Sequence, residues 1–177
     1  MELGKLTFTE ADSTSELVAE PVMKFLSNQG FAGVYASQSD TELADTENFC
    51  QAYDIGLDVS ANCVVVKAKR ADRVWYAALM ILATDRADVN KTVKKHLDAR
   101  KLSFAPMDEA VELTGMEYGG ITPIGLPEDW QILVDSSVAE TDALVIGSGI
   151  RGSKLVVRGD YLANLPNSSV LDMKIPT

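Results

Sequence analysis

Several residue types that build specialised sites are scarce in this chain of 177 residues. It contains two cysteines, Cys50 and Cys63, one histidine, His96, and no C-x-x-C pair. A structural zinc ion usually takes four cysteine or histidine ligands, so the ordinary zinc-binding modules are excluded. Residues 1–10 lack the basic and apolar regions of an export signal, and we therefore expect both cysteines to remain reduced thiols.

Long apolar runs are missing as well. The longest, residues 74–83, has about half of the roughly 20 residues that a membrane-spanning helix requires. Apolar residues nevertheless make up 46% of the chain, which is enough for a hydrophobic core. We therefore predict a cytoplasmic protein with no membrane partner, folded as a single domain over residues 1–177.

Positive charge is scarce overall and concentrated in one segment. The net charge of −10 argues against a general binder of DNA or other nucleic acids. Residues 1–60 hold two basic and 11 acidic side chains, whereas residues 67–101 hold ten basic and four acidic ones. A basic segment of this kind can receive phosphate groups, and Lys91, Lys94 and Lys95 are its candidate contacts. The alternative is that these lysines only line a solvated helix face.

The pattern of apolar and turn residues predicts both helices and strands. Ser13 and Glu16 form a capping-box pattern and predict a first helix over residues 14–28, with Pro21 as a kink. A hairpin is expected from the strands 63–69 and 74–83. The other expected helices cover residues 46–53, with Asp45 or Thr46 as the N-terminal cap, and residues 89–97, 106–113 and 160–165. The other expected strands cover residues 31–37, 102–105, 131–135, 143–147 and 154–158.

The order of these elements bears on the fold class. Strands and helices do not alternate regularly, so a doubly wound parallel sheet is not favoured. We predict a mixed α+β fold in which a barrel-like sheet of about seven strands is flanked by helices. Residues 167–177 are expected to form an extension.

The segment from Gly147 to Gly152 matches the spacing G-x-G-x-x-G. A dinucleotide site needs a helix that begins within these glycines, because the pyrophosphate binds at the helix N-terminus. Here the glycines lead into Ser153 and a β-branched run, which predicts a strand. We therefore interpret the segment as a glycine-rich crossover between two strands, whose backbone N–H groups can still face a ligand.

The most distinctive segment, residues 118–125, contains Gly119, Gly120, Thr122 and Pro123. Glycine permits positive φ angles and close backbone contacts, while proline restricts the far side of the loop. A rigid loop with exposed backbone amides suits a carboxylate, a phosphate or a developing oxyanion. An ordinary tight turn uses the same residues for conformational reasons, and that alternative stays open.

Two isolated polar residues are weaker candidates. Asp135 follows a strand and stands beside two serines, so it could contact a ligand. The alternative is a turn-forming aspartate that accepts local N–H bonds. His96 lies on the lysine-rich helix and is expected to be an exposed surface residue, so no Ser-His-Asp arrangement can be argued from it.

Several segments occur together in the order of one known family. Gly56-Leu57-Asp58 precedes the valine strand, and a helix ending in Leu113-Thr114-Gly115 leads into the loop 118–125. Leu133-Val134-Asp135 and Gly147-Ser148-Gly149 follow. Over roughly residues 43–165 the chain resembles the YbaK-type aminoacyl-tRNA deacylases, a family that includes the insertion editing domain of bacterial prolyl-tRNA synthetases.

The resemblance implies a pocket for the aminoacyl group at the 3′ end of tRNA. Residues 119–123 would hold the aminoacyl moiety and the ester carbonyl, and residues 147–149 would form the opposite wall. Family members often carry a lysine at the start of the first hairpin strand, where this chain has Asn62. Asparagine keeps the hydrogen-bonding groups and loses the charge. Lys67 stands five residues farther on and therefore on the opposite face of the strand.

The leading hypothesis is a trans-acting aminoacyl-tRNA deacylase that uses no cofactor and no metal. Its partner would be the 3′ end of an aminoacyl-tRNA, with an aminoacyl-tRNA synthetase as a candidate second partner. Backbone N–H groups of the two glycine segments would stabilise the oxyanion, and Asn62 would orient the amino acid or the ribose. The alternatives are a binding module of the same fold without hydrolysis and, third, a nucleotide-dependent enzyme that uses the Gly147 motif.

Overall fold

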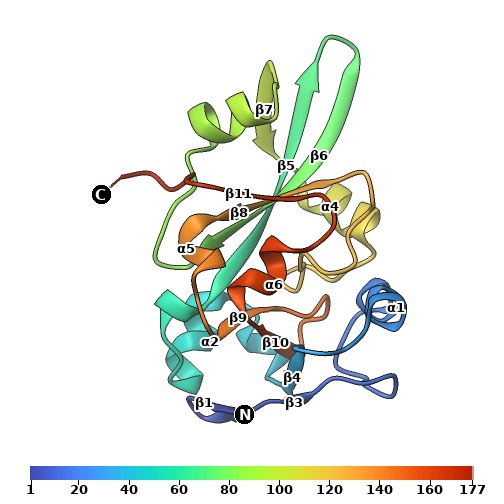
Figure 1. Ribbon diagram of the computed structural model, residues 1–177, viewed down its shortest axis with the longest axis vertical. Helices are drawn as coiled ribbons and strands as arrows, with labels where there is room; N and C mark the ends of the chain where they lie inside the picture. The colour runs from blue at the N-terminus through green and yellow to red at the C-terminus, as the bar shows by residue number, and fades with distance from the viewer. Residues whose placement is uncertain (177) are drawn as a thin grey trace.

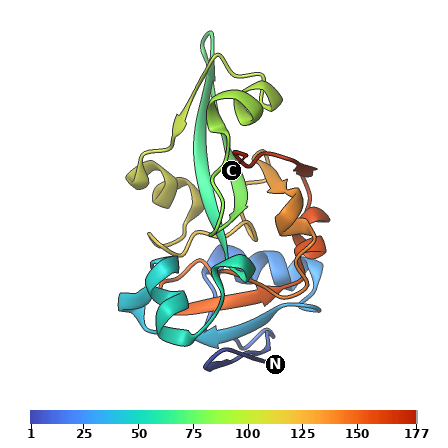
Figure 2. The ribbon, with the colours of Figure 1, turned by 90° about the vertical axis from the view of Figure 1, so that its left-hand side faces the viewer.

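The computed structural model describes residues 1–176 and has two β-sheets, a small N-terminal hairpin and short helices (Figure 1). The hairpin pairs β1 (Glu2–Leu3) with β2 (Leu6–Thr7). The strands of the smaller sheet run across the lower end of the larger one, as the turned view in Figure 2 shows. The molecule is therefore a mixed α+β fold, as the sequence predicted.

The larger sheet has five strands in the order β11-β8-β6-β5-β7. Its centre is the long antiparallel hairpin of β5 and β6, which confirms the expected hairpin. β8 runs parallel to β6, and β11 runs parallel to β8 within the C-terminal extension. The strand bounds are β5 (Ala61–Arg70), β6 (Arg73–Leu82), β7 (Lys101–Phe104), β8 (Gln131–Asp135) and β11 (Ser168–Leu171).

The smaller sheet has four antiparallel strands in the order β3-β4-β10-β9. A single parallel bridge, from Ser60 to Val145, joins it to the start of β5. The expected barrel-like sheet of about seven strands is wrong in this respect: within residues 1–176 the ladders stay open, because β5 pairs with β9 at this bridge alone. The strand bounds are β3 (Thr9–Glu10), β4 (Tyr35–Gln38), β9 (Leu144–Gly147) and β10 (Ser153–Val157).

The first helix begins later than the sequence predicted. The Asp12 carboxylate accepts hydrogen bonds from both the N–H and the hydroxyl of Thr14, so this segment is a turn and the capping box expected at Ser13 is wrong. Helix α1 (Glu20–Gln29) starts just before Pro21. Proline is tolerated there because the first turn of a helix does not use its missing N–H. Pro21 therefore begins a helix and does not kink one.

The remaining helices are short, and none of those in residues 1–176 has the length and apolar character needed to cross a membrane. The predicted cap of α2 is confirmed, because the Asp45 carboxylate accepts the Asn48 N–H at 3.1 Å. The helix expected over residues 89–97 is instead a π-helical turn followed by one α-helical turn. The bounds are η1 (Thr41–Leu43), α2 (Thr46–Tyr53), η2 (Leu57–Val59), η3 (Val89–Val93), α3 (Lys94–His96), α4 (Met107–Thr114), α5 (Ser136–Ala139) and α6 (Gly159–Ala163).

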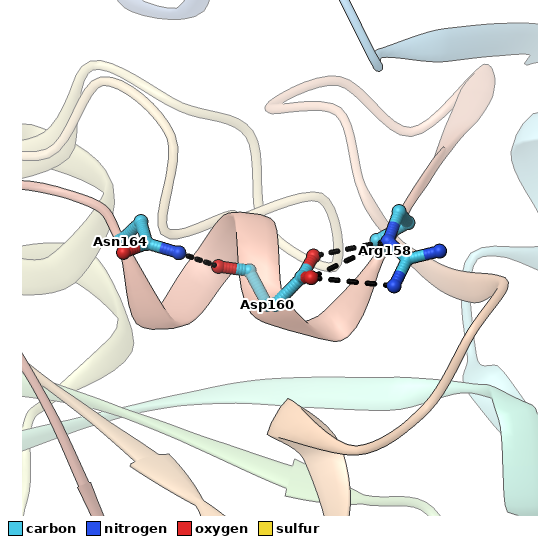
Figure 3. Close-up of polar contacts among 3 residues, drawn as sticks. All are labelled: Arg158, Asp160 and Asn164. Atoms are coloured by element: carbon cyan, nitrogen blue, oxygen red, sulfur yellow. Dashed lines mark hydrogen bonds and ion pairs between the residues drawn. The ribbon is translucent and has the colours of Figure 1, made fainter.

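Helix α6 is fixed at the surface by local polar contacts (Figure 3). The Asp160 carboxylate accepts Arg158 Nε at 3.2 Å, and the Asp160 carbonyl accepts Asn164 Nδ2 at 2.7 Å. Beneath these contacts Gly159 meets the carbonyl of Val138 so closely that a Cβ would lie 2.0 Å from it. No side chain larger than that of glycine therefore fits at this position.

The hydrophobic core lies where the two sheets meet. Leu26 of α1 packs in one cluster with Ile146 of the smaller sheet and Val134 of the larger sheet. A second cluster joins Phe49 of α2 to Val145 of β9. Because each cluster ties a helix to the smaller sheet, α1 and α2 hold that sheet against the foot of the β5–β6 hairpin.

Candidate functional site

The two glycine segments singled out in the sequence pack backbone to backbone. The Gly149 N–H donates to the Gly120 carbonyl at 2.6 Å, and the Glu117 N–H donates to the Gly149 carbonyl at 2.8 Å. A Cβ added to Gly120 would lie 2.7 Å from the backbone carbonyl of Ile150. Only glycine allows such an approach, so the two segments form one continuous wall.

Arg151 ties this wall to the segment that precedes α2. Its guanidinium donates to the Tyr118 carbonyl at 3.1 Å and to the Thr41 carbonyl at 3.2 Å. Its backbone N–H donates to the Glu117 carboxylate at 2.8 Å. Gly119, with φ +82°, leaves space for the guanidinium, since a Cβ there would lie 3.0 Å from Nη1. Arg151 was not predicted from the sequence, in which its signal is a cation inside a glycine-rich turn.

Asn62 lies at the start of β5, beside the same segment. Its amide oxygen accepts the Thr46 hydroxyl at 2.5 Å. Two residues earlier Ser60 bridges Val145 in parallel fashion, and two residues beyond Val145 stands Gly147. Parallel strands advance together, so Asn62 and Gly147 lie at the same level. The contact with Thr46 occupies the amide oxygen and leaves the two amide N–H donors available to a ligand.

Lys154 is a buried cation next to these residues. It lies in β10 opposite Gly147 and is only 7% exposed. Its Nζ donates to the Ala44 carbonyl at 3.3 Å and stands 5.2 Å from the centre of the Phe49 ring. Burial lowers the pKa of the Lys154 ammonium. Lys154 was not predicted from the sequence either, in which its signal is a charge within an otherwise apolar strand.

Residues 41–46 are the meeting point of these groups. The carbonyls of Thr41 and Ala44 accept Arg151 and Lys154, and Thr46 holds Asn62. The Ala44 Cβ also lies 3.3 Å from the place that a Cβ on residue 119 would take. The structure thus gathers around one short segment a set that we call the glycine-loop site: Asn62, Gly119, Gly120, Gly147, Gly149, Arg151 and Lys154.

Three other predicted site residues support the glycine segments from the interior. Thr122 and Ser148 are fully buried, and Pro123 is buried as well. The Ser148 hydroxyl shares a hydrogen bond of 2.6 Å with the hydroxyl of Ser153. Pro123 lines a separate cleft of about 820 Å³ that opens between α1 and Trp130. Their side chains fix the shape of the loops in this structure.

Asp135 is near Asn62 and does not meet it. The two residues flank Ile81 in one cross-strand row, so they stand two strand spacings apart, about 10 Å. The buried carboxylate of Asp135 accepts the Met173 N–H at 2.9 Å and the Ser137 N–H at 3.2 Å. These bonds fasten the C-terminal extension and the start of α5, which is the turn-forming role that the sequence left as the alternative.

Lys91, Lys94 and Lys95 lie far from the glycine-loop site. Lys91 and Lys95 are exposed, and Lys94 is partly exposed. Their helical turns pack on Val66 and neighbouring residues of β5, on the strand face to which Asn62 also belongs. At the usual rise per residue Val66 lies about 13 Å from Asn62, and Arg70 at the distal end of β5 lies about 26 Å from it. Figure 1 accordingly shows these turns at the upper end of the hairpin and α2 at the lower end.

Lys67 faces away from the glycine-loop site, as the alternation along β5 predicts. Its ammonium contacts both oxygens of the Glu109 carboxylate, at 2.9 and 3.0 Å. The Tyr76 hydroxyl donates to the same carboxylate at 2.7 Å. Hydrogen bonds from Tyr76 and Lys67 lower the pKa of Glu109. Lys67 is thus committed to α4 and cannot supply a charge at Asn62.

The polar side chains of the glycine-loop site are mainly hydrogen-bond donors. It presents a buried ammonium, a guanidinium and an amide around a backbone wall, all groups that bind electron-rich oxygen. Within residues 1–176 no three His, Cys, Asp or Glu side chains lie close enough together to bind a metal ion. The glycines lead into β10 and not into a helix, so the helix N-terminus of a dinucleotide site is not built here.

Comparison with known proteins identifies the family. Residues 40–165 match the model of the aminoacyl-tRNA editing domain. The chain belongs to this family. The matched range contains every residue of the glycine-loop site, so the site is built within the editing domain itself. The resemblance stated from the sequence is confirmed at the level of the family.

The individual relatives share little sequence identity with this chain. Over 75 residues the chain is 31% identical to a proline–tRNA ligase of Listeria monocytogenes, a match that covers 42% of the chain and 13% of the ligase. The solved structure of a candidate trans-editing enzyme for prolyl-tRNA synthetase matches with a TM-score of 0.75 and 18% identity, over 88% of this chain and 96% of that one.

The same fold also occurs in a protein that is described as having a different role. A candidate signal transduction protein from Marinobacter aquaeolei matches with a TM-score of 0.62 and 17% identity, over 88% of this chain and 30% of that one. Identities this low show a shared fold. The fold alone therefore does not fix the reaction, which has to be argued from the site.

Proposed function

We propose that this editing domain is a trans-acting deacylase that hydrolyses the aminoacyl ester of mischarged tRNA. The observation that supports it most is the convergence of Asn62, the wall of Gly119, Gly120 and Gly149, and two cations within the range matched by the family. The Asn62 amide and the two cations are donors, and an aminoacyl ester offers what they bind, namely a carbonyl oxygen and a ribose hydroxyl. The N–H groups of Gly120 and Gly149, expected from the sequence to stabilise the oxyanion, instead donate to backbone carbonyls within the wall. The partners that we infer are the 3′ end of aminoacyl-tRNA and, through the ligase relatives, a prolyl-tRNA synthetase.

In the proposed reaction the protein contributes position and donors. A water molecule adds to the ester carbon, and the carbonyl electron pair moves onto the oxygen. Donors that are already fixed in place stabilise that oxyanion without any reorganisation. When the electron pair returns, the bond to the ribose oxygen breaks, and that oxygen takes up the proton that the water gave up. The products are the free amino acid and tRNA with a free terminal hydroxyl.

The basic turns η3 and α3 offer a second surface that could contact the tRNA in the proposed complex. They pack on Val66 and Ala68, about 13–20 Å from Asn62 along β5, which corresponds to roughly four to six stacked nucleotides of one strand at about 3.4 Å each. We infer that Lys91, Lys94 and Lys95 contact phosphates of the acceptor stem while the 3′ end occupies the glycine-loop site. The acidic remainder of the chain favours this single orientation.

A panel of mischarged tRNAs tests the proposal. Each tRNA carries one labelled non-cognate amino acid, and release of the label is followed with and without the protein. We expect hydrolysis well above the spontaneous rate for at least one amino acid, and much slower hydrolysis of the correctly charged tRNA. Spontaneous rates throughout the panel, with a folded protein, would refute the deacylase proposal.

A second candidate is a binding module of the same fold that does not hydrolyse its ligand. Asn62 favours it, because this position often holds a lysine in the family and here lacks a charge. Its amide oxygen is also occupied by Thr46. Calorimetry with aminoacyl-adenosine amides, in which an amide replaces the labile ester, separates the two candidates. Binding of these compounds without turnover of any ester in the panel would select the binding module.

A further inference from the structure

Lys154 is a buried ammonium without a carboxylate partner in residues 1–176. Three ion pairs occur in that range, and Lys154 takes part in none of them. It is 7% exposed, its contact with the Ala44 carbonyl is long at 3.3 Å, and an ammonium has three donors. Burying a charge is costly unless opposite charge or hydrogen bonds compensate it. The Phe49 ring, 5.2 Å away, compensates part of the charge, and two donors of the ammonium have no hydrogen-bond partner among the described residues.

The groups around Lys154 are few and of mixed charge. The charged and titratable groups that act on it are Cys50 and Asp45 from the α2 side and Arg151 from its own turn. Arg151 is partly exposed and gives two of its five guanidinium N–H donors to backbone carbonyls. The side chain of Lys154 also ends at Ala44, the residue that lies against Gly119. Among the described residues of the site, Lys154 is thus the buried cation with donors to spare.

Resting on the proposed deacylase function, we propose that Lys154 is the residue that stabilises the oxyanion, donating from its ammonium to the ester carbonyl oxygen of the aminoacyl group. Asn62 then orients the ribose or the amino acid, and the glycine wall confines the ester. The positive charge then belongs to Lys154 of β10, which lies across the site from Asn62 at the start of β5. In this arrangement Asn62 needs no charge.

Kinetics of two substitutions test this role. Lys154→Met removes the charge and keeps an unbranched apolar side chain, and Lys154→Arg keeps the charge. Loss of one preorganised oxyanion donor typically lowers kcat by about 100-fold to 1,000-fold. We expect Lys154→Met to fall in this range with KM within about twofold, and Lys154→Arg to recover part of the loss. Lys67→Met, a lysine of the adjacent sheet that is bound to Glu109, is the matched control and should keep kcat.

The pH profile adds a readout that a structural role would not move. Burial lowers the pKa of the Lys154 ammonium below its ordinary 10.5, so the catalysed rate should decline on the alkaline side as the ammonium loses its proton. Lys154→Met should lose this decline. A kcat within twofold of wild type in Lys154→Met would overturn the assignment, and so would a rise of KM alone, which would place the ammonium on a tRNA phosphate.

A spectroscopic measurement tests the role of Lys154 even if Lys154→Met does not fold or the wild-type protein hydrolyses no substrate. Lysines labelled with ¹³C at Cε report the protonation and surroundings of each ammonium, and the Lys154 signal is assigned by its absence in Lys154→Arg. Addition of aminoacyl-adenosine amides should shift this signal and leave that of Lys67 in place. A wild type without hydrolysis refutes the deacylase function alone, whereas an unmoved Lys154 signal at saturating ligand refutes the role of Lys154.

Discussion

Substitution of Gly120 by alanine tests whether the shape of the backbone wall carries the activity. The added Cβ would lie 2.7 Å from the carbonyl carbon and oxygen of Ile150 and 2.9 Å from its nitrogen. All three are backbone atoms, so no side chain can rotate away. Carbon atoms prefer separations of about 3.5 Å or more, and the two segments must therefore move apart by about 0.8 Å. The hydrogen bond from Gly149 to Gly120 must lengthen with them.

The size of the expected loss follows from that displacement. A misplacement of about 1 Å can cost on the order of 100-fold in rate, so we expect kcat/KM of Gly120→Ala to fall between about 10-fold and 100-fold. Forcing extra volume into a packed region also lowers the free energy of unfolding by about 1–3 kcal/mol.

The assay is deacylation of the best tRNA of the panel, together with urea unfolding. Gly152→Ala is the matched control, since its Cβ would meet only the Thr41 methyl group at 3.3 Å and its φ is not positive. Hydrolysis by Gly120→Ala at the rate of Gly152→Ala, with the expected loss of stability, would refute the reasoning that the wall positions the substrate.

Two further predictions concern charge. Replacing Lys91, Lys94 and Lys95 together by glutamine should weaken tRNA binding. The slope of log affinity against log salt should fall in magnitude by up to about 2.1–2.7, because each lost phosphate contact removes about 0.7–0.9. Binding titrations at several salt concentrations measure this slope, and an unchanged slope would place the contact elsewhere. Glu109→Gln should lower the free energy of unfolding at neutral pH. The pKa of Glu109 lies below its ordinary 4.5, because Tyr76 and Lys67 donate hydrogen bonds to the carboxylate. The difference in stability from wild type should therefore vanish as pH falls through this pKa. Thermal melts over a range of pH check the sign, and a difference that persists well below that pKa would contradict the ion pair as its cause.

The elements predicted correctly from the sequence are those set by neighbouring residues. The Asp45 cap and the β5–β6 hairpin depend on side chains and turns within a few positions of one another. The first helix was misplaced because two local signals competed, and the Asp12 turn prevailed over the capping box at Ser13. The β11 strand was missed because its partner β8 lies more than 30 residues earlier, and short parallel pairing has no local signal.

The same distinction holds for the glycine-loop site. Its glycines stand out because few residue types tolerate their φ angles and contacts. Arg151 and Lys154 do not stand out, because what makes them functional candidates is their bonds to Thr41 and Ala44, each 110 positions away. A lysine in a strand is ordinary until its burial is known. Sequence patterns therefore located the wall of the site and missed its charges.

The backbone contact between Gly120 and Ile150 also constrains how this domain can diversify. A protein that changes specificity by varying loops usually alters one loop at a time while the framework holds the others still. Here an insertion in either turn would displace its neighbour too, since no side chain lies between them to absorb the change. Diversification in this part of the domain therefore requires coordinated change in both turns.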